Sequence, residues 1–224
     1  MLRATFPSEP AAAIALQRQL APMVRETLPP RRILYVAGVD VAYDRERGVS
    51  VGAAVILSWP ALVTEDVVVL TEAIAFPYVP GLLSFREAPV LYNILRPLRK
   101  RFDVLFVDGQ GRAHPRRIGL ASHLGLLLEK PTIGCAKSRL CGEEIGVLGM
   151  NRGARVPLSD RGERVGTVLR TRPGVKPLYV SVGHLCRLSW AEEMVLAAAP
   201  RYRVPEPTRQ ADIAVATAKK DIPA

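Results

Sequence analysis

The chain has 224 residues, 49% hydrophobic and 23% charged, which predicts one globular domain over residues 1–224 and excludes a disordered, collagen-like or low-complexity protein. Lys and Arg number 31 against 21 Asp and Glu, so the formal net charge is +10 at pH 7. Such a surplus favours a polyanionic partner such as nucleic acid, although a basic surface can also serve solubility alone.

The first third of the chain predicts one helix and three strands. Apolar residues at helical spacing predict a helix over residues 9–27, which the proline pair at 29 and 30 would end. Short turns separate three β-rich runs, a pattern typical of an antiparallel meander. The expected strands cover residues 33–40, 49–57 and 63–75.

The middle of the chain alternates helices with strands. Two prolines stiffen residues 76–81, and Ser84 with Glu87 resembles a capping box that opens a helix running to Arg101, kinked or shortened at Pro97. A strand over 104–108, a helix over 118–129 and a strand over 132–136 are expected to follow.

The last third predicts fewer regular elements. Residues 142–176 are rich in Gly and Arg and are expected to be irregular, with one strand over 165–170. A strand over 178–182 and helices over 189–198 and 208–220 are expected next. A meander followed by β-α-β-α-β units predicts an α/β fold, in which a mixed central sheet, antiparallel and then parallel, is flanked by helices.

Cysteine usage and the amino terminus bear on the compartment. Cys135, Cys141 and Cys186 are odd in number and form no CxxC pair, which argues against a disulfide framework or a zinc site. The start MLRATFPSEP lacks the apolar region of a signal peptide, and no apolar run is long enough for a membrane span. We therefore expect a reduced, cytoplasmic protein with no membrane contact. Because no coiled-coil seam is present, we expect a monomer.

Three carboxylates are candidate metal ligands. Asp40 and Asp108 are each expected at the end of a strand, where ligands gather on such sheets, and Glu87 in the first turn of a helix. Hard divalent cations such as Mg²⁺ prefer oxygen ligands, and near phosphates they are held by a few carboxylates. Taken singly, an aspartate often just closes a strand, and Glu87 would just cap its helix.

The segment from Asp108 to Arg117 follows a strand with a glycine turn. Its two glycines allow the backbone to approach a flat or anionic ligand, and His114, Arg116 and Arg117 add donors for phosphate oxygens. The third glycine of a dinucleotide fingerprint is missing, because Pro115 stands there. An ordinary glycine turn with solvated arginines is the alternative.

Three further side chains are suited to nucleic-acid chemistry. Lys137, at the end of an expected strand, could neutralise charge on a phosphate during cleavage. His184, at the end of another, could orient water or ligate a metal. Tyr78 lies between two prolines and could fill the gap left by an unstacked base. The plain alternatives are a surface lysine, a loop histidine and a turn tyrosine.

Seven segments, in order along nearly the whole chain, resemble endonuclease V, the family that nicks DNA at deoxyinosine. The matching segments are VDVAY (39–43), PYVPGLLSFRE (77–87), VDGQGRAHPR (107–116), GLASHLG (119–125), PTIGCAK (131–137), YVSVGH (179–184) and PEPTR (205–209). The resemblance implies a ribonuclease H-like fold, which agrees with the expected order of strands.

The resemblance also implies roles for individual residues. Asp40, Glu87 and Asp108 would bind Mg²⁺, with Mn²⁺ also supporting activity; Lys137 would support the scissile phosphate, and His184 would lie near the metal. Tyr78 would separate the strands, and the glycine turn would line a pocket for the flipped hypoxanthine. The residues expected to contact DNA are Pro77, Tyr78, Pro80, Gly81, Gly109, Gly111, His114 and Arg116.

Two positions depart from the family pattern. Val182 replaces the proline of a usual V-S-P-G-H segment, and Leu185 with Cys186 follows where a basic residue is common, which leaves the local backbone beside His184 in doubt. Ser138 also stands where a second lysine is common. Neither change removes a group that the implied chemistry needs.

The activity implied is DNA repair: hydrolysis of the second phosphodiester bond 3′ to the deaminated base, leaving 3′-hydroxyl and 5′-phosphate ends. One alternative keeps the nuclease and changes its substrate to inosine-containing RNA or a branched DNA junction. A non-catalytic nucleic-acid binder of the same fold is a second alternative, and a small-molecule phosphohydrolase is a third.

Overall fold

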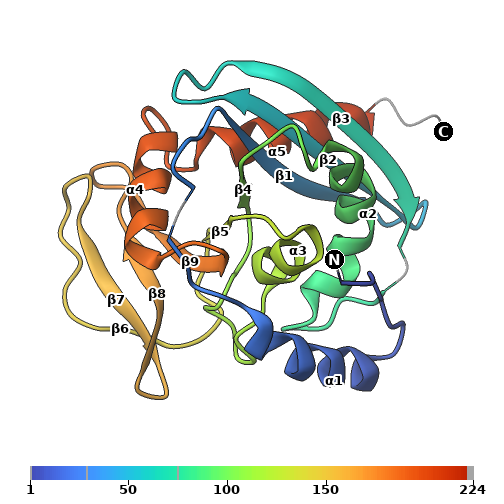
Figure 1. The fold of residues 1–224 in the computed structure, drawn as a ribbon, viewed down its shortest axis with the longest axis horizontal. Helices are drawn as coiled ribbons and strands as arrows, with labels where there is room; N and C mark the ends of the chain where they lie inside the picture. Colours follow the sequence, from blue (N-terminus) through green and yellow to red (C-terminus); the bar gives the residue numbers. More distant parts are fainter. Residues whose placement is uncertain (1, 29, 75, 221–224) are drawn as a thin grey trace.

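The computed structural model describes residues 2–28, 30–74 and 76–220. Within these residues a single mixed sheet runs through the molecule in the order β3-β2-β1-β4-β5-β9-β8-β7-β6, with helices on both faces (Figure 1). No helix in this described part of the chain combines the length and apolar character needed to cross a membrane. Cys135, Cys141 and Cys186 are all free thiols.

The first half of the sheet has the predicted topology. β1 (Tyr35–Asp44), β2 (Val49–Ser58) and β3 (Thr64–Ala73) form an antiparallel meander. β4 (Val104–Val107) and β5 (Thr132–Ala136) then run parallel to β1. This antiparallel meander followed by parallel strands confirms the ribonuclease H-like fold class.

The second half of the sheet corrects the prediction of an irregular segment over 142–176. β9 pairs antiparallel with β5, and three further antiparallel pairings extend the sheet through β8 and β7 to β6. The chain reverses between β7 and β8 at Arg161 and Gly162, which both have positive φ and form a tight hairpin turn. The strands are β6 (Glu143–Glu144), β7 (Arg155–Asp160), β8 (Glu163–Leu169) and β9 (Leu178–His184).

Four helices cover the two faces of the sheet. Because side chains alternate along a strand, Ala37 and Val39 of β1 pack with α2 (Leu83–Leu98) and α3 (Leu120–Leu128), whereas Val36 packs in the core on the other face. That other face carries α4 (Leu188–Ala198) and α5 (Glu206–Lys220). Figure 1 shows α5 running along β1 and β2.

Two helix boundaries differ from the prediction. α1 (Pro10–Leu20) gives way to a 3-10 turn at Ala21–Met23 that contains Pro22, so the helix ends well before residue 27. The capping box at the start of α2 is also wrong: the hydroxyl of Ser84 is buried without a hydrogen-bond partner, and no side chain caps the helix. The carboxylate of Glu87 therefore does not cap α2.

Asp40 lies in the middle of β1, not at its end as predicted. β4 pairs with β1 only from Val36 to Val39, so Asp40 is the first residue beyond the parallel pairing and lies beside the end of β4. Two residues earlier, Gly38 lies directly under Pro207 of α5, where any Cβ would overlap the proline backbone. This glycine allows α5 to cross β1 closely enough to contribute to the same edge of the sheet.

Candidate active site

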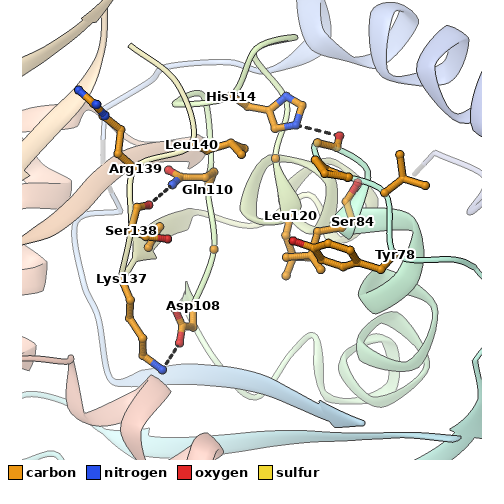
Figure 2. Close-up of a pocket in the computed structure, with 17 residues that line it drawn as sticks. Tyr78, Ser84, Asp108, Gln110, His114, Leu120, Lys137, Ser138, Arg139 and Leu140 are labelled. Atoms are coloured by element: carbon orange, nitrogen blue, oxygen red, sulfur yellow. Dashed lines mark hydrogen bonds and ion pairs between the residues drawn. The ribbon is translucent and has the colours of Figure 1, made fainter. Parts of the chain in front are cut away.

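Four of the predicted site residues gather where β1, β4 and β5 lie side by side. Asp40 projects from β1, Asp108 directly follows β4, and Lys137 directly follows β5. The Nζ of Lys137 is 2.5 Å from the Oδ2 of Asp108 (Figure 2). Glu87 approaches from α2 and is electrostatically coupled to both aspartates. These four residues, with Asp212 described below, are called the acidic centre.

Two carboxylates of the acidic centre, Asp40 and Glu87, resist ionisation because their pKa values are raised. Burial, and next the charge of Asp108, raise the pKa of Asp40 to about 7. Burial raises the pKa of Glu87 to about 8, against the opposing effect of the Tyr43 hydroxyl, which donates a 3.0 Å hydrogen bond to its Oε1. Burial alone would lower the pKa of Lys137, but the ion pair with Asp108 raises it overall. The centre therefore contains more carboxyl groups than its one lysine can neutralise if all of them ionise.

Asp212 is a fifth member of the acidic centre that the sequence did not predict. It lies on α5, and its charge raises the pKa values of both Asp40 and Lys137. The family-like segment that the sequence offered ends at Arg209, three residues earlier. Only the crossing of α5 over β1 brings this exposed helical aspartate to the centre, so no local pattern could have identified it.

The donor chemistry of the acidic centre suits a hard divalent cation. Burial, and to a smaller extent repulsion between the carboxylates, raises the pKa values of Asp40 and Glu87. Carboxylate oxygens are the ligands that Mg²⁺ prefers. Across residues 2–28, 30–74 and 76–220, however, no three His, Cys, Asp or Glu side chains are placed so that they could hold a metal ion. In this arrangement the carboxylate of Asp108 is engaged in an ion pair with Lys137. The predicted metal site therefore stays a prediction.

A pocket of about 280 Å³ adjoins the acidic centre. Asp108 and Lys137 lie at one end of it, and Tyr78, whose surface is 72% exposed, lies at the other (Figure 2). Between them the wall is formed by the turn after β4, the start of α3 and the residues after β5. The lining includes Val79, Pro80, Gly81, Leu83, Ser84, Gly109, Gln110, His114, Gly119, Leu120, Ser138, Arg139 and Leu140.

The two glycines of the turn after β4 have different roles. Gly109 lines the pocket, as predicted for a backbone that approaches a ligand. Gly111 does not: its N–H donates a 2.9 Å hydrogen bond to the Ser181 hydroxyl, and a Cβ there would overlap the carbonyl of Val182. Gly111 is therefore needed for packing against β9 and does not line the pocket, and its expected contact with DNA stays a prediction.

His114 and Arg116 hold the Tyr78 loop, residues 76–81, instead of facing outward to phosphate. The carbonyl of Gly81 accepts hydrogen bonds from His114 Nε2 (3.0 Å), Arg116 Nη2 (2.8 Å) and Gln17 Nε2 (3.0 Å). Burial lowers the pKa of His114 to about 4, so its ring is neutral at pH 7. Its Nδ1 accepts from the Arg116 backbone, which leaves Nε2 as the donor. The three side chains form a clamp on the Gly81 carbonyl.

Replacing the clamp residue Gln17 should destabilise the protein. Gln17 is buried, and its Oε1 accepts from Arg116 Nε while its Nε2 donates to Gly81. Gln17→Met keeps the length of the side chain but removes both hydrogen bonds, so the free energy of unfolding should fall by about 1–3 kcal/mol. Urea unfolding measures this fall. The matched change Gln19→Met, at an exposed position of the same helix, should shift it by less than about 0.5 kcal/mol.

His184 and the acidic centre lie at opposite ends of the sheet's strands. β9 runs antiparallel to β5, so its final residue, His184, pairs with Thr132 at the start of β5 rather than with Lys137 after its end. At about 3.4 Å per residue, the five residues from Thr132 to Lys137 separate His184 from Lys137 by roughly 17 Å. The Nδ1 of His184 accepts a 3.2 Å hydrogen bond from the Arg25 backbone. The prediction that His184 lies near the metal is therefore wrong.

The departures from the family pattern have local structural explanations. The carbonyl of Val182 accepts a 2.8 Å hydrogen bond from the Arg112 backbone, and Leu185 adopts positive φ and donates its N–H to Arg25. Both lie in or after β9 and away from the acidic centre. Ser138 does line the pocket, and its carbonyl accepts a 2.9 Å hydrogen bond from the Gln110 side chain.

The mixed sheet, the acidic centre at the ends of its parallel strands and the adjoining pocket define an α/β enzyme of the nuclease class. Comparison with known proteins identifies the family to which the chain belongs. The family model described as Endonuclease V matches residues 18–213, and the chain belongs to that family.

Relatives and solved structures agree along almost the whole chain. Endonuclease V of Gloeobacter violaceus is 50% identical over 204 residues, covering 90% of this chain and 83% of its own. The crystal structure of Endonuclease V from Streptomyces avermitilis has a TM-score of 0.89 at 41% identity and covers 100% of this chain and 98% of its own. Endonuclease V of Ciona intestinalis, in complex with a 24mer DNA containing an inosine followed by a ribo-adenosine, has a TM-score of 0.85 at 28% identity and covers 95% and 98%.

Proposed function

We propose that this nuclease recognises deaminated purines in DNA and hydrolyses the second phosphodiester bond 3′ to the lesion, leaving 3′-hydroxyl and 5′-phosphate ends. The observation that carries the proposal is the direct junction between the acidic centre and a pocket with an exposed tyrosine at its rim. The net charge of +10 favours a polyanionic substrate, and a relative of the same fold has been crystallised with inosine-containing DNA.

In this proposal Asp40, Glu87 and Asp108 hold Mg²⁺, or Mn²⁺ in its place, and Asp212 adds its charge from α5. When bound, the metal lowers the pKa of water and neutralises charge on the phosphate. Asp40 and Glu87 must give up the protons that their raised pKa values retain near pH 7. Lys137, freed from Asp108, places its ammonium group against the scissile phosphate.

The pocket would discriminate hypoxanthine from adenine through backbone donors. Leu120 lines the pocket and is the first residue of α3, and N–H groups in the first turn of a helix have no partner within the helix. Such a donor suits the six-carbonyl of hypoxanthine, whereas adenine presents an amino donor there. Donor facing donor costs roughly 1–3 kcal/mol. Guanine carries the same carbonyl, so a second contact has to exclude its two-amino group.

A nicking assay tests the proposed function. A duplex with one inosine, labelled in turn at each end of the inosine strand, is incubated with the protein and Mg²⁺, with Mn²⁺, and with a chelator. The proposal expects one nick at the second bond 3′ to inosine with either metal, and none with the chelator. A nick elsewhere, equal cutting of an inosine-free duplex, or cutting in the chelator would contradict it.

An inosine-specific endoribonuclease is the second candidate. The observation that favours it is the ribo-adenosine that follows the inosine in the DNA bound by the Ciona intestinalis relative. Matched inosine-containing DNA and RNA strands, compared by kcat/KM in the same assay, distinguish the two. A branched junction without inosine, added as a third substrate, separates lesion recognition from recognition of structure.

Tyr78→Ala should weaken binding of inosine DNA more than it slows the cut. Tyr78 is held on the clamped loop and is largely exposed, so its ring is available to fill the space of an extruded base. We expect KM to rise about tenfold with little change in kcat. Tyr35→Ala, at an exposed tyrosine that begins β1, is the matched control and should leave KM unchanged. Equal affinity of the Tyr78 variant and the parent for inosine DNA would count against a wedge.

A further inference from the structure

A second exposed tyrosine lies beside the acidic centre. Tyr202, in the loop between α4 and α5, is 47% exposed. The guanidinium of Arg209 lies over its ring, with 4.4 Å from Cζ to the ring centroid, and Arg209 is in turn held by both carboxylate oxygens of Glu206. Tyr202 and Arg209 therefore form a fixed stacked pair, in which an aromatic ring and a cation are presented together.

The stacked pair is anchored to the acidic centre at two points. Arg203 Nη2 donates to the carbonyl of Lys137 and to that of Pro177, each at 2.8 Å, and this ties the loop to the end of β5. Arg209 also precedes Asp212 by one turn of α5, and Asp212 is coupled to Asp40 and Lys137. The stacked pair thus borders the centre on the face of the sheet that α5 covers.

The pocket borders the centre on the other side. Its Tyr78 loop packs against α1 and the start of α2, whereas α5 lies on the opposite face of the sheet. In Figure 2 Asp108 and Lys137 lie together on one side of the pocket, and Tyr78 lies on the other. A strand whose deaminated base fills the pocket and whose second phosphodiester bond lies at the centre must continue, in the 3′ direction, away from the pocket.

We propose that Tyr202 and Arg209 bind the nucleotide immediately 3′ to the cut bond, with its base stacked on the tyrosine ring and its phosphate near the guanidinium. The inference rests on the proposed function and extends it to a second substrate contact. Aromatic rings stack on any base, so the contact is independent of sequence, and arginine adds attraction for the phosphate backbone. The alternative is that the stacked pair serves only to hold the loop.

Removing one base from the substrate tests the proposal. The substrate is a single-stranded oligonucleotide with one inosine, and its second nucleotide after the inosine is either intact or abasic. For the parent protein the abasic residue should raise KM about tenfold at constant kcat. For Tyr202→Ala the KM should already be raised about tenfold on the intact strand, and the abasic residue should add nothing. Tyr202→Phe should behave as the parent does.

Two controls separate stacking from support of the loop. Tyr202→Leu fills the same space without an aromatic ring, so it should behave as Tyr202→Ala does; behaviour like Tyr202→Phe would overturn the proposal. An abasic residue at the sixth nucleotide after the inosine should affect all variants equally. Thermal melting identifies any variant that fails to fold, and Tyr202→Phe then carries the comparison with the parent.

The outcomes distinguish the inference from the function on which it rests. Two outcomes would refute the stacking contact while the nuclease function stands. In one, the parent nicks the intact and abasic strands with the same KM; in the other, removal of the base raises the KM of Tyr202→Ala as much as it raises that of the parent. If the parent nicks neither inosine strand at the second bond, the proposed function fails and the inference fails with it.

Discussion

Asp40→Asn and Asp108→Asn should each slow the nicking of inosine DNA by about a thousandfold or more. Both residues lie at the edge where β1 and β4 pair, and each couples electrostatically to the other and to Lys137. An amide keeps the shape of the carboxylate but cannot supply the negative charge that a divalent cation requires. Losing several kcal/mol of transition-state stabilisation corresponds to a factor of this size.

Single-turnover rates at saturating enzyme measure the effect on the cut, and fluorescence anisotropy with inosine DNA measures binding. Binding should be retained or slightly strengthened, because one negative charge is removed from a surface that faces phosphate. Glu46→Gln makes the same change of charge at an exposed position in the turn after β1, and it should leave the rate unchanged. Nicking at the parental rate by either asparagine variant, with contaminating nuclease excluded, would remove that residue from the proposed mechanism.

The metal-free protein should lose stability as the pH rises from about 5 to 8. The pKa of Asp40 is raised from 3.8 to about 7 and that of Glu87 from 4.5 to about 8, so the folded chain holds protons that the unfolded chain has released. Wherever the folded state binds more protons, the free energy of unfolding falls with increasing pH. The contribution of these two groups to the free energy of unfolding is therefore fully present below about pH 4. It is lost as the pH rises through their folded-state pKa values of about 7 and about 8.

Thermal melting in the presence of a chelator measures this loss. We expect the Tm of the parent to fall by about 5 °C or more across the window, since 1 kcal/mol corresponds to about 2–4 °C for a chain of this size. Asp40→Asn should have a flatter profile because it lacks one of the two titrating groups. Excess Mg²⁺ should raise the Tm most at high pH, where the carboxylates are already ionised. A parental Tm that is constant from pH 5 to 8 would contradict the raised pKa values.

The parts of the fold that the sequence predicted well are those with a strong local pattern. β5 was predicted with its observed bounds because Thr132–Ala136 is a buried run between Pro131 and Lys137. The meander was predicted from three β-rich runs with short turns. In the same way Asp108 and Lys137 were found because each directly follows a short buried strand.

The errors concern features that depend on distant parts of the chain. His184, at the end of another strand, was expected near the metal on the basis of the family resemblance, but nothing within residues 178–184 specifies that β9 runs antiparallel to β5. Arg116 has the side chain of a phosphate ligand, yet its guanidinium donates to the carbonyl of Gly81, more than thirty residues away. His114 bonds to the same carbonyl but also lines the pocket. The strand predicted over 165–170 is β8, but β7 and its hairpin with β8 were missed because the surrounding glycines and arginines were interpreted as irregular structure.

The close crossing of α5 over Gly38 has a consequence for synthesis of the protein on the ribosome. The residues of the acidic centre come from positions 40 to 212, and the last of them reaches its place only when α5 lies across the first strand. A nascent chain that has not yet produced its final helix lacks Asp212 and the cover over β1. If the acidic centre makes the cut, we expect partial translation products that lack α5 to be inactive.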